Sequence, residues 1–175
     1  MQKLVSNRGR YMRAKIPYMR IALTILVCVA LAVVVLLNVF THIFSVVQYY
    51  GDGMEPNLKD RQVLLILKTD QVEQGDIVAF YYNNKVLVRR IISGGGTSVE
   101  MDERGIVTVD GNRLDEPYVK EHSAGQCNIS FPYTVPYDEF FVMGDHRAIA
   151  MDSRLEEIGT IPRDRVMGKV LLSFG

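Results

Sequence analysis

The chain has 175 residues, 48% of them hydrophobic, which excludes a disordered chain and limits it to one globular domain or a small domain with an appendage. Its 20 basic and 20 acidic side chains cancel, but residues 1–20 hold six basic residues and no acidic one, so the remainder carries a net charge near −6. A body without excess positive charge argues against nucleic acid as the main partner.

An apolar segment follows the basic arm. No Asp, Glu, Lys or Arg occurs between Ile21 and Val47, and a helix over this stretch would be about 40 Å long, enough to cross a bilayer. The sequence therefore predicts a basic cytoplasmic arm over 1–20, a transmembrane helix over 21–48 in contact with membrane lipid, and an extracytoplasmic domain over 49–175. The arm places the N-terminus in the cytoplasm, so the rest lies outside the cell membrane.

A cleaved signal peptide is the main alternative to this anchor. Ala30-Leu31-Ala32 resembles a cleavage site. Apolar residues continue over 33–37, however, and no polar segment precedes the site, which favours an uncleaved helix. The two cysteines exclude a disulfide scaffold and a Cys-rich zinc module. Cys28 falls in the membrane segment and Cys127 outside it, so they cannot pair, and Cys127 is expected to be a buried thiol rather than a reactive one.

The domain after the membrane segment is expected to be all-β, a barrel or a folded sheet. Short alternating or apolar runs recur between turn signals, of which Asn83-Asn84 is typical of a hairpin and Asp110-Gly111 marks a turn. The expected strands cover residues 61–67, 76–82, 85–92, 97–101, 105–109, 139–143 and 166–174. Residues 117–136 show little periodicity and are expected to form a long loop.

Four short motifs occur in this domain, and each alone is compatible with an ordinary turn or strand. They are Gly51-Asp52-Gly53-Met54-Glu55-Pro56-Asn57-Leu58, Gly75-Asp76-Ile77-Val78-Ala79-Phe80, Val88-Arg89-Arg90-Ile91-Ile92, and Val142-Met143-Gly144-Asp145-His146-Arg147 followed by Met151-Asp152-Ser153-Arg154. In this order, after one N-terminal anchor, they resemble the motifs of bacterial type I signal peptidases, the S26 serine peptidases. The resemblance extends from the anchor to Gly168-Lys169.

The resemblance implies a membrane-anchored, all-β catalytic domain that cleaves signal peptides from exported preproteins. In that family a Ser nucleophile is activated by a Lys general base, and no metal or other cofactor takes part. The matching residues fall into two groups. Met54 and Pro56 are implied to contact substrate; Gly144, Asp145, Arg147, Asp152, Ser153 and Arg154 are implied to support the site.

The sequence departs from the family at three positions that the resemblance assigns to catalysis. Gly53 stands where the nucleophilic Ser belongs and has no side chain to attack a peptide bond. Arg89 stands where the Lys base belongs, and a guanidinium is not deprotonated in proteins at ordinary pH. Ala150 replaces a Ser that orients the Lys. Losing the nucleophile alone lowers turnover on the order of 10⁶-fold, so all three positions are predicted to be non-functional in catalysis.

Three hypotheses follow for the function. The first is a binding protein that holds a secreted polypeptide or pilin segment without cleaving it. This agrees with the resemblance to signal-peptidase-like proteins of Gram-positive bacteria that lack the dyad and assist pilus assembly beside sortases. The second is an active signal peptidase, which requires a misread alignment or an unconventional nucleophile and base, for which Ser153, Asp52 and Lys85 are candidates. The third is an engineered inactive variant. His146 and Ala150 also depart from the family motif, which favours natural degeneration over deliberate design. On the first hypothesis, the Arg89 cation pairs with Asp52, Glu55, Asp152 or a carboxylate of a partner.

Overall fold

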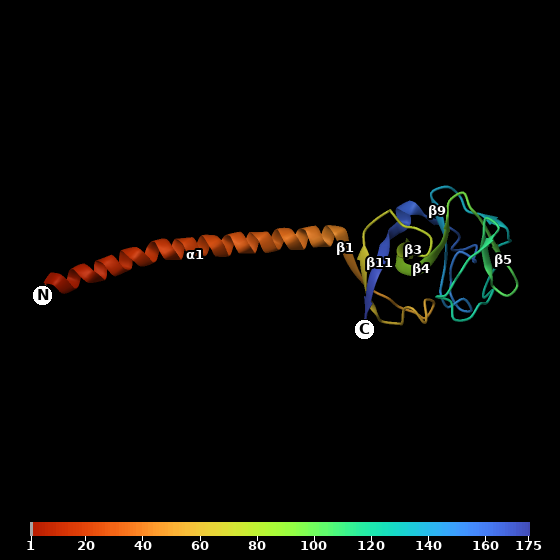
Figure 1. Cartoon of the computed structure of the whole chain (residues 1–175), viewed down its shortest axis with the longest axis horizontal. Helices are drawn as coiled ribbons and strands as arrows, with labels where there is room; N and C mark the ends of the chain where they lie inside the picture. The colour runs from red at the N-terminus through yellow and green to blue at the C-terminus, as the bar shows by residue number, and fades with distance from the viewer. Residues whose placement is uncertain (1) are drawn as a thin grey trace. The chain divides into compact units, whose positions relative to one another are not determined.

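A computed structural model describes the backbone of residues 2–175 and the side chains of residues 18–175. The chain divides into an N-terminal unit that ends at His42 and a second unit, Ile43–Gly175. Helix α1 (Gln2–Ile43) makes up the first unit, so the segment predicted as a basic arm continues the helix. Its part from Tyr18 to Ile43, in which a window of 18 residues has a mean hydropathy of 3.0, is long and apolar enough to cross a membrane; Figure 1 shows this helix.

The predicted end of the membrane helix is wrong by five residues. Helix α1 ends at Ile43, and Phe44–Gln48 forms strand β1, which pairs antiparallel with β2 (Val63–Leu67) over its whole length. The N–H of Lys68 donates to the carbonyl of Ile43 at 2.8 Å, which extends this pairing to the last helical residue. An uninterrupted apolar run does not reveal where a helix gives way to a half-buried strand, because both accept the same side chains.

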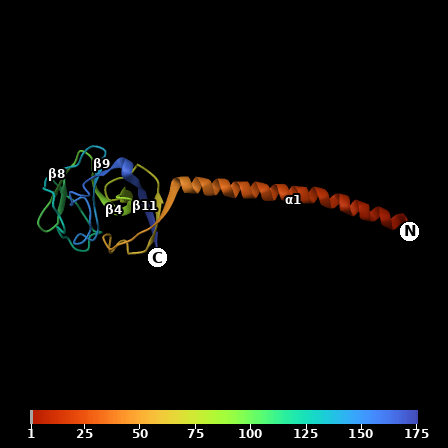
Figure 2. The same cartoon turned by 180° about the vertical axis from the view of Figure 1, so that it is seen from behind.

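The second unit is all-β, as predicted, and consists of two antiparallel sheets. Its remaining elements are β3 (Ile77–Tyr82), β4 (Lys85–Gly94), β5 (Ser98–Met101), β6 (Val107–Val109), β7 (Asn112–Arg113), β8 (Tyr133–Thr134), β9 (Glu139–Met143), β10 (Ile161–Pro162), the 3-10 helix η1 (Arg163–Arg165) and β11 (Val166–Phe174). One sheet has the order β1-β2-β11-β3-β4-β9-β10 and the other β7-β6-β5-β8. Figures 1 and 2 place β5 and β8 at one end of this unit and β11 with the C-terminus at the other.

The side chains of the larger sheet fill two separate hydrophobic clusters. Val78 and Phe80 of β3 pack in one cluster, and Ala79 between them packs in the other with Tyr49 and Met54. This alternation follows from the two-residue repeat of a strand. A third cluster, which includes Phe141 of β9 and Val99 of β5, joins the two sheets. The larger sheet is therefore covered on both faces, and the loop that carries Gly53 is attached through Met54.

The predicted hairpin at Asn83-Asn84 and the predicted turn at Asp110-Gly111 are both confirmed. Asn83 and Asn84 have positive φ values of 44° and 59° between β3 and β4, and Asp110 and Gly111 have values of 50° and 77° between β6 and β7. Positive φ at both central residues is the conformation that matches the strand twist of a two-residue hairpin. The sequence signal was strong here because few residue types adopt this conformation without strain.

The expected long loop over 117–136 is mostly irregular but includes β8. It is attached to the fourth motif: the N–H of Asn128 donates to the carbonyl of Arg154 at 3.1 Å, and Arg154 Nη1 donates to the carbonyl of Ala124 at 2.8 Å. Cys127 lies in this loop and is exposed. The expectation of a buried thiol is therefore wrong, because the loop lies at the surface and supplies no core around its sulfur.

Candidate functional site

The loop of the first motif is joined to the fourth motif by two contacts of His146. Its backbone N–H donates to the carbonyl of Gly53 at 3.0 Å, and its Nδ1 lies 3.2 Å from the carbonyl oxygen of Asp52. A Cβ atom on Gly144 would lie 2.4 Å from the Gly53 carbonyl oxygen and 2.2 Å from the Ala150 Cβ. Only glycine at position 144 therefore permits this approach. Two segments that lie 90 residues apart in the chain meet at Gly53.

Gly53 lies against the guanidinium of Arg89, so the structure brings together two of the positions that the sequence singled out. A Cβ on Gly53 would lie 3.2 Å from Arg89 Nη2 and 3.4 Å from its Cζ. A side chain at position 53 would thus start in contact with the side chain at position 89. At this distance a nucleophile at position 53 could interact with a base at position 89. In this chain the guanidinium of Arg89 faces the backbone of Gly53 instead.

The Arg89 side chain is held by main-chain carbonyl groups. Nε donates to Met151 O at 2.8 Å, Nη1 donates to Val88 O at 2.6 Å, and the residue is 6% exposed. Burial lowers the pKa of Arg89 below its ordinary value, while Asp152 and Tyr49 act in the opposite direction. An arginine guanidinium nevertheless stays protonated in proteins near neutral pH. It cannot accept a proton as a general base.

Ala150 lies beside this pair and is 2% exposed. Its methyl group offers neither a donor nor an acceptor to residue 89. The polar contact comes instead from the carbonyl of the next residue, Met151, which accepts the hydrogen bond of Arg89 Nε. A carbonyl suits a guanidinium donor, so the loop is complementary to the Arg that is present.

A cavity of about 200 Å³ opens over Gly53 and Arg89. Its lining comes from the first motif, β4 and the segment around Ala150: Tyr49, Tyr50, Gly51, Asp52, Gly53, Val86, Leu87, Val88, Arg89, Ile149, Ala150 and Met151. Tyr50, Ile149 and Met151 are among its exposed apolar residues, at 69%, 52% and 53%. The cavity thus combines exposed apolar side chains with polar groups and one buried cation.

One edge of β4 is free along this cavity. Residues 85–90 of β4 pair with β3, whereas β9 pairs with β4 only from Arg90 to Gly94. Over residues 85–89, no strand in the described part of the chain occupies the second edge. An unpaired strand edge beside a cavity can accept an extended peptide as an added strand.

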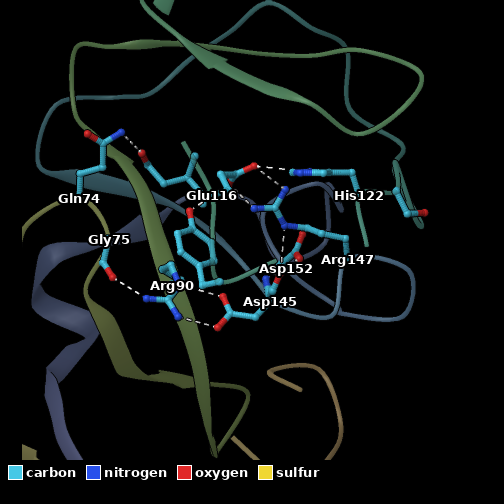
Figure 3. Close-up of polar contacts among 12 residues, drawn as sticks. Gln74, Gly75, Arg90, Glu116, His122, Asp145, Arg147 and Asp152 are labelled. Atoms are coloured by element: carbon cyan, nitrogen blue, oxygen red, sulfur yellow. Dashed lines mark hydrogen bonds and ion pairs between the residues drawn. The ribbon is translucent and has the colours of Figure 1, made fainter. Parts of the chain in front are cut away.

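A network of buried ion pairs supports the site (Figure 3). Arg90 forms a two-pronged contact with Asp145, at 2.8 Å from Nε and 2.6 Å from Nη2, and its guanidinium lies 4.0 Å from the centre of the Tyr118 ring. Arg147, fully buried, contacts both oxygens of Glu116. Breaking a buried pair of this kind destabilises a protein by about 3–5 kcal/mol. These residues are therefore structural supports.

The segment from Asp152 to Arg154 forms hydrogen bonds within itself and to β9. Asp152 accepts from Arg154 Nε and Nη2, each at 2.8 Å, and from the N–H of Gly144 at 2.9 Å. Ser153 Oγ accepts from the N–H of Val142 at 3.0 Å and is 1% exposed. Ser153 is therefore sealed from any substrate, and Lys85, another candidate for unconventional catalysis, is exposed to solvent at the start of β4.

Sequence reasoning missed the roles of four residues of this region, one of which, Asn57, stands in the first motif. Glu116 and Tyr118 hold the buried Arg147 and Arg90, and the Tyr118 hydroxyl donates to Glu116 Oε1 at 2.9 Å. Burial, with a contribution from Glu116, raises the pKa of Tyr118 well above 10.0. Asn57 and Tyr49 were also missed: Asn57 Nδ2 donates to Asp145 Oδ2 at 2.8 Å, and the Tyr49 hydroxyl accepts from the N–H of Met54 at 3.1 Å. None lies in a periodic segment that would have marked it.

The implied substrate contact of Met54 is corrected by its burial. Its side chain is 0% exposed and packs in the cluster that contains Leu58, Leu64 and Ile66. The apolar character of Met54 thus anchors the loop of Gly53 to the sheet. Pro56 is exposed and lines a separate hollow with His146, so its role in binding stays a prediction.

Among residues 18–175, no group of three or more His, Cys, Asp and Glu side chains could hold a metal ion.

Comparison with known proteins adds a second line of evidence. The family model described as "Signal peptidase, peptidase S26" matches residues 19–174. Signal peptidase IB of Staphylococcus aureus is 30% identical over 170 residues, which cover 85% of this chain and 87% of the relative. Signal peptidase I S of Bacillus subtilis is 30% identical over 152 residues, covering 80% and 82%.

A crystal structure of a signal peptidase I from Enterococcus faecalis is also similar. It is 27% identical, covers 58% of this chain and 97% of its own, and superposes with a TM-score of 0.49. The sequence comparisons extend over both units of the chain, and the matched residues contain Gly53, Arg89 and Ala150.

Proposed function

This chain belongs to the S26 signal peptidase family, and we propose that it is a member that binds an extended segment of a secreted polypeptide without cleaving it. The contact between Gly53 and the guanidinium of Arg89 carries this proposal, because it puts a bare backbone and a permanent cation where the family's motifs put Ser and Lys. The first has no nucleophilic atom and the second cannot take a proton. Ala150 removes the remaining hydroxyl from the same place.

The parts needed for binding are independent of the missing groups. The free edge of β4, the cavity of about 200 Å³ and the exposed apolar side chains of Ile149 and Met151 would receive a polypeptide in extended form. Main-chain hydrogen bonds along a strand edge provide affinity, and pockets for alternate side chains provide selectivity. A family member can thus lose cleavage and keep recognition.

The proposed role is assistance of pilus assembly at the outer face of the cell membrane. The resemblance to pilus-associated members without the dyad supports a pilin subunit as the polypeptide and the sortase machinery as a companion. The apolar segment Tyr18–Ile43 would anchor the chain, with the basic arm in the cytoplasm according to the positive-inside rule. The second unit would then face the polypeptides that leave the cell.

The test uses the full chain in non-ionic detergent and a purified pilin precursor. We expect saturable binding that falls at least tenfold in Ile149→Arg, since this exposed residue lines the cavity. Tyr137→Arg is the matched control: Tyr137 is also exposed, at 86%, but lies outside the lining of the cavity. Equal loss in both variants, or no binding by the unmodified chain, would contradict the proposal.

A further inference from the structure

Arg89 is a buried cation whose hydrogen-bonding capacity is only partly used. A guanidinium has five N–H donors. One from Nε and one from Nη1 are taken by the carbonyls of Met151 and Val88. The Tyr49 hydroxyl is the other polar neighbour and can accept one more. At least two donors are therefore left for a group from outside the protein.

The other buried arginines around the site each have a carboxylate partner. Arg90 contacts Asp145, Arg147 contacts Glu116 and Arg154 contacts Asp152. Arg89 is the exception: among the side chains of residues 18–175, no carboxylate oxygen lies within 4.0 Å of its nitrogens.

None of the three internal carboxylates considered from the sequence forms an ion pair with Arg89. Asp152 is engaged by Arg154 and acts on Arg89 only through space, while Asp52 and Glu55 form no ion pair with it. A buried charge without an opposite charge in contact is costly. Its place in the lining of the cavity points to a partner charge that is supplied with a ligand.

The space beside Arg89 is shaped for that partner. Gly53 adds no side chain over Nη2, and a Cβ there would lie only 3.2 Å from this nitrogen. Gly53 and Arg89 both line the cavity of about 200 Å³. The backbone N–H of Gly53 donates to no acceptor among the residues that the structure describes. A planar anion could thus meet two kinds of donor at one place.

We propose that Arg89 and Gly53 form a binding site for a carboxylate carried by the polypeptide that occupies the cavity. The carboxylate is either the C-terminal group of the polypeptide or the side chain of an Asp or Glu within it. Guanidinium and carboxylate groups fit each other as paired forks, and such charge-assisted contacts are about twice as strong as neutral ones. The former catalytic position thereby becomes the position that selects the ligand. This inference rests on the proposed function, since it specifies the segment that is bound.

Three fluorescein-labelled peptides of one alanine-rich sequence test the inference. The first ends in a C-terminal amide, the second in a free carboxylate, and the third is the amide with one central Gln replaced by Glu. Binding to the full chain in non-ionic detergent is measured by fluorescence anisotropy. We expect at least one acidic peptide to bind tenfold or more tightly than the neutral amide. The second and third peptides show which source of carboxylate is used.

Two charge-removing variants of β4 serve as a matched pair. Arg89→Gln should abolish the preference, so that the acidic peptide binds no more tightly than the neutral one, because the charge contact is removed. Lys85→Gln removes a cation from the exposed start of the same strand and should leave the preference intact. Thermal unfolding of both variants verifies that they are folded, and Arg89→Lys provides a second variant with the charge retained.

The outcomes separate this inference from the function on which it rests. Neutral and acidic peptides that bind equally would overturn the carboxylate site and leave polypeptide binding in place. If no peptide binds, N-acetylalanine is compared with N-acetylalaninamide by the NMR signal of Arg89 Nε–H, assigned through its loss in Arg89→Lys. A shift with the acid alone would keep the carboxylate site and overturn polypeptide binding. No shift with either would overturn both.

Discussion

At the scale of single residues, Gly53 and Arg89 are complementary, and replacing one without the other should not restore catalysis. Gly53→Ser alone places a hydroxyl against the guanidinium, which must move by a few tenths of an ångström and still cannot accept a proton. Gly53→Ser with Arg89→Lys supplies both a nucleophile and a base. We expect the double variant to cleave a signal-peptide substrate at least about 100-fold faster than the unmodified chain, a small part of the loss of about 10⁶ that a missing nucleophile causes.

The matched controls for this restoration are the two single variants, which should remain at the background rate. Adding Ala150→Ser to the double variant should raise the rate further, because a hydroxyl is returned beside residue 89. The readout is the appearance of the shortened product on a denaturing gel. If Gly53→Ser alone were as active as the double variant, residue 89 would not be the position of the base.

Two buried serines allow a second comparison at this scale. Among the described residues, Ser93 Oγ is the fully buried side-chain polar atom that lacks a hydrogen-bond partner, whereas Ser153 Oγ accepts from the N–H of Val142. Ser153→Ala leaves that N–H unsatisfied and should lower the free energy of unfolding by about 1–3 kcal/mol. Ser93→Ala removes an unpaired hydroxyl and should leave it unchanged or raise it. Urea unfolding of both variants measures the difference; equal destabilisation would contradict this account of Ser93.

At the scale of secondary-structure elements, strand β1 makes the start of a soluble fragment critical. A fragment of residues 50–175 lacks both β1 and Tyr49, which is 4% exposed and donates its N–H to the carbonyl of Gln62 at 2.8 Å. Losing one buried aromatic side chain costs about 3–5 kcal/mol, and β2 becomes an open edge that favours aggregation. We expect this fragment to be less stable by at least about 3 kcal/mol than a fragment of residues 43–175.

The comparison of the two fragments is made by thermal unfolding and size-exclusion chromatography. The fragment of residues 43–175 retains all five residue pairs between β1 and β2 and should elute as one species with a single transition. Equal stability of the two fragments would mean that β1 contributes nothing to the sheet.

The elements with alternating patterns or strong turn signals could be predicted from the sequence, and those that depend on distant partners could not. The bounds of β9 and β11 agree with the prediction at both ends, and the Asn83-Asn84 turn fixed the hairpin before β4. The two-residue strands β7, β8 and β10 carry no detectable period. Strand β1 was hidden in the apolar run because its identity depends on β2, which lies fifteen or more residues away.

The candidate site was predictable where it consists of motifs and not where it consists of loop contacts. The contact of Gly53 with Arg89 joins two motifs that the order along the chain had already singled out. Glu116 and Tyr118, by contrast, contact Arg147 and Arg90 from a segment without any pattern. Their roles follow from the need to neutralise buried arginines, a need that is visible only once the burial is known.

At the scale of the whole molecule, two cysteines report the proposed orientation in the membrane. Cys127 is exposed in the second unit, and Cys28 lies within the apolar segment Tyr18–Ile43. A membrane-impermeant maleimide added to intact cells should label the chain through Cys127. Cys127→Ser should abolish the labelling, whereas Cys28→Ser should leave it unchanged. Labelling that requires cell lysis would contradict an N-terminus in the cytoplasm and a second unit outside.

We propose that this member of the S26 family binds a secreted polypeptide and does not cleave it. The most direct measurement follows both in one sample: the full chain in non-ionic detergent is mixed with a pilin precursor that carries its signal peptide, with an active family member in parallel. We expect a stable complex and a precursor of unchanged length at the time when cleavage in the parallel sample is complete. A shortened precursor in the presence of the unmodified chain would contradict it.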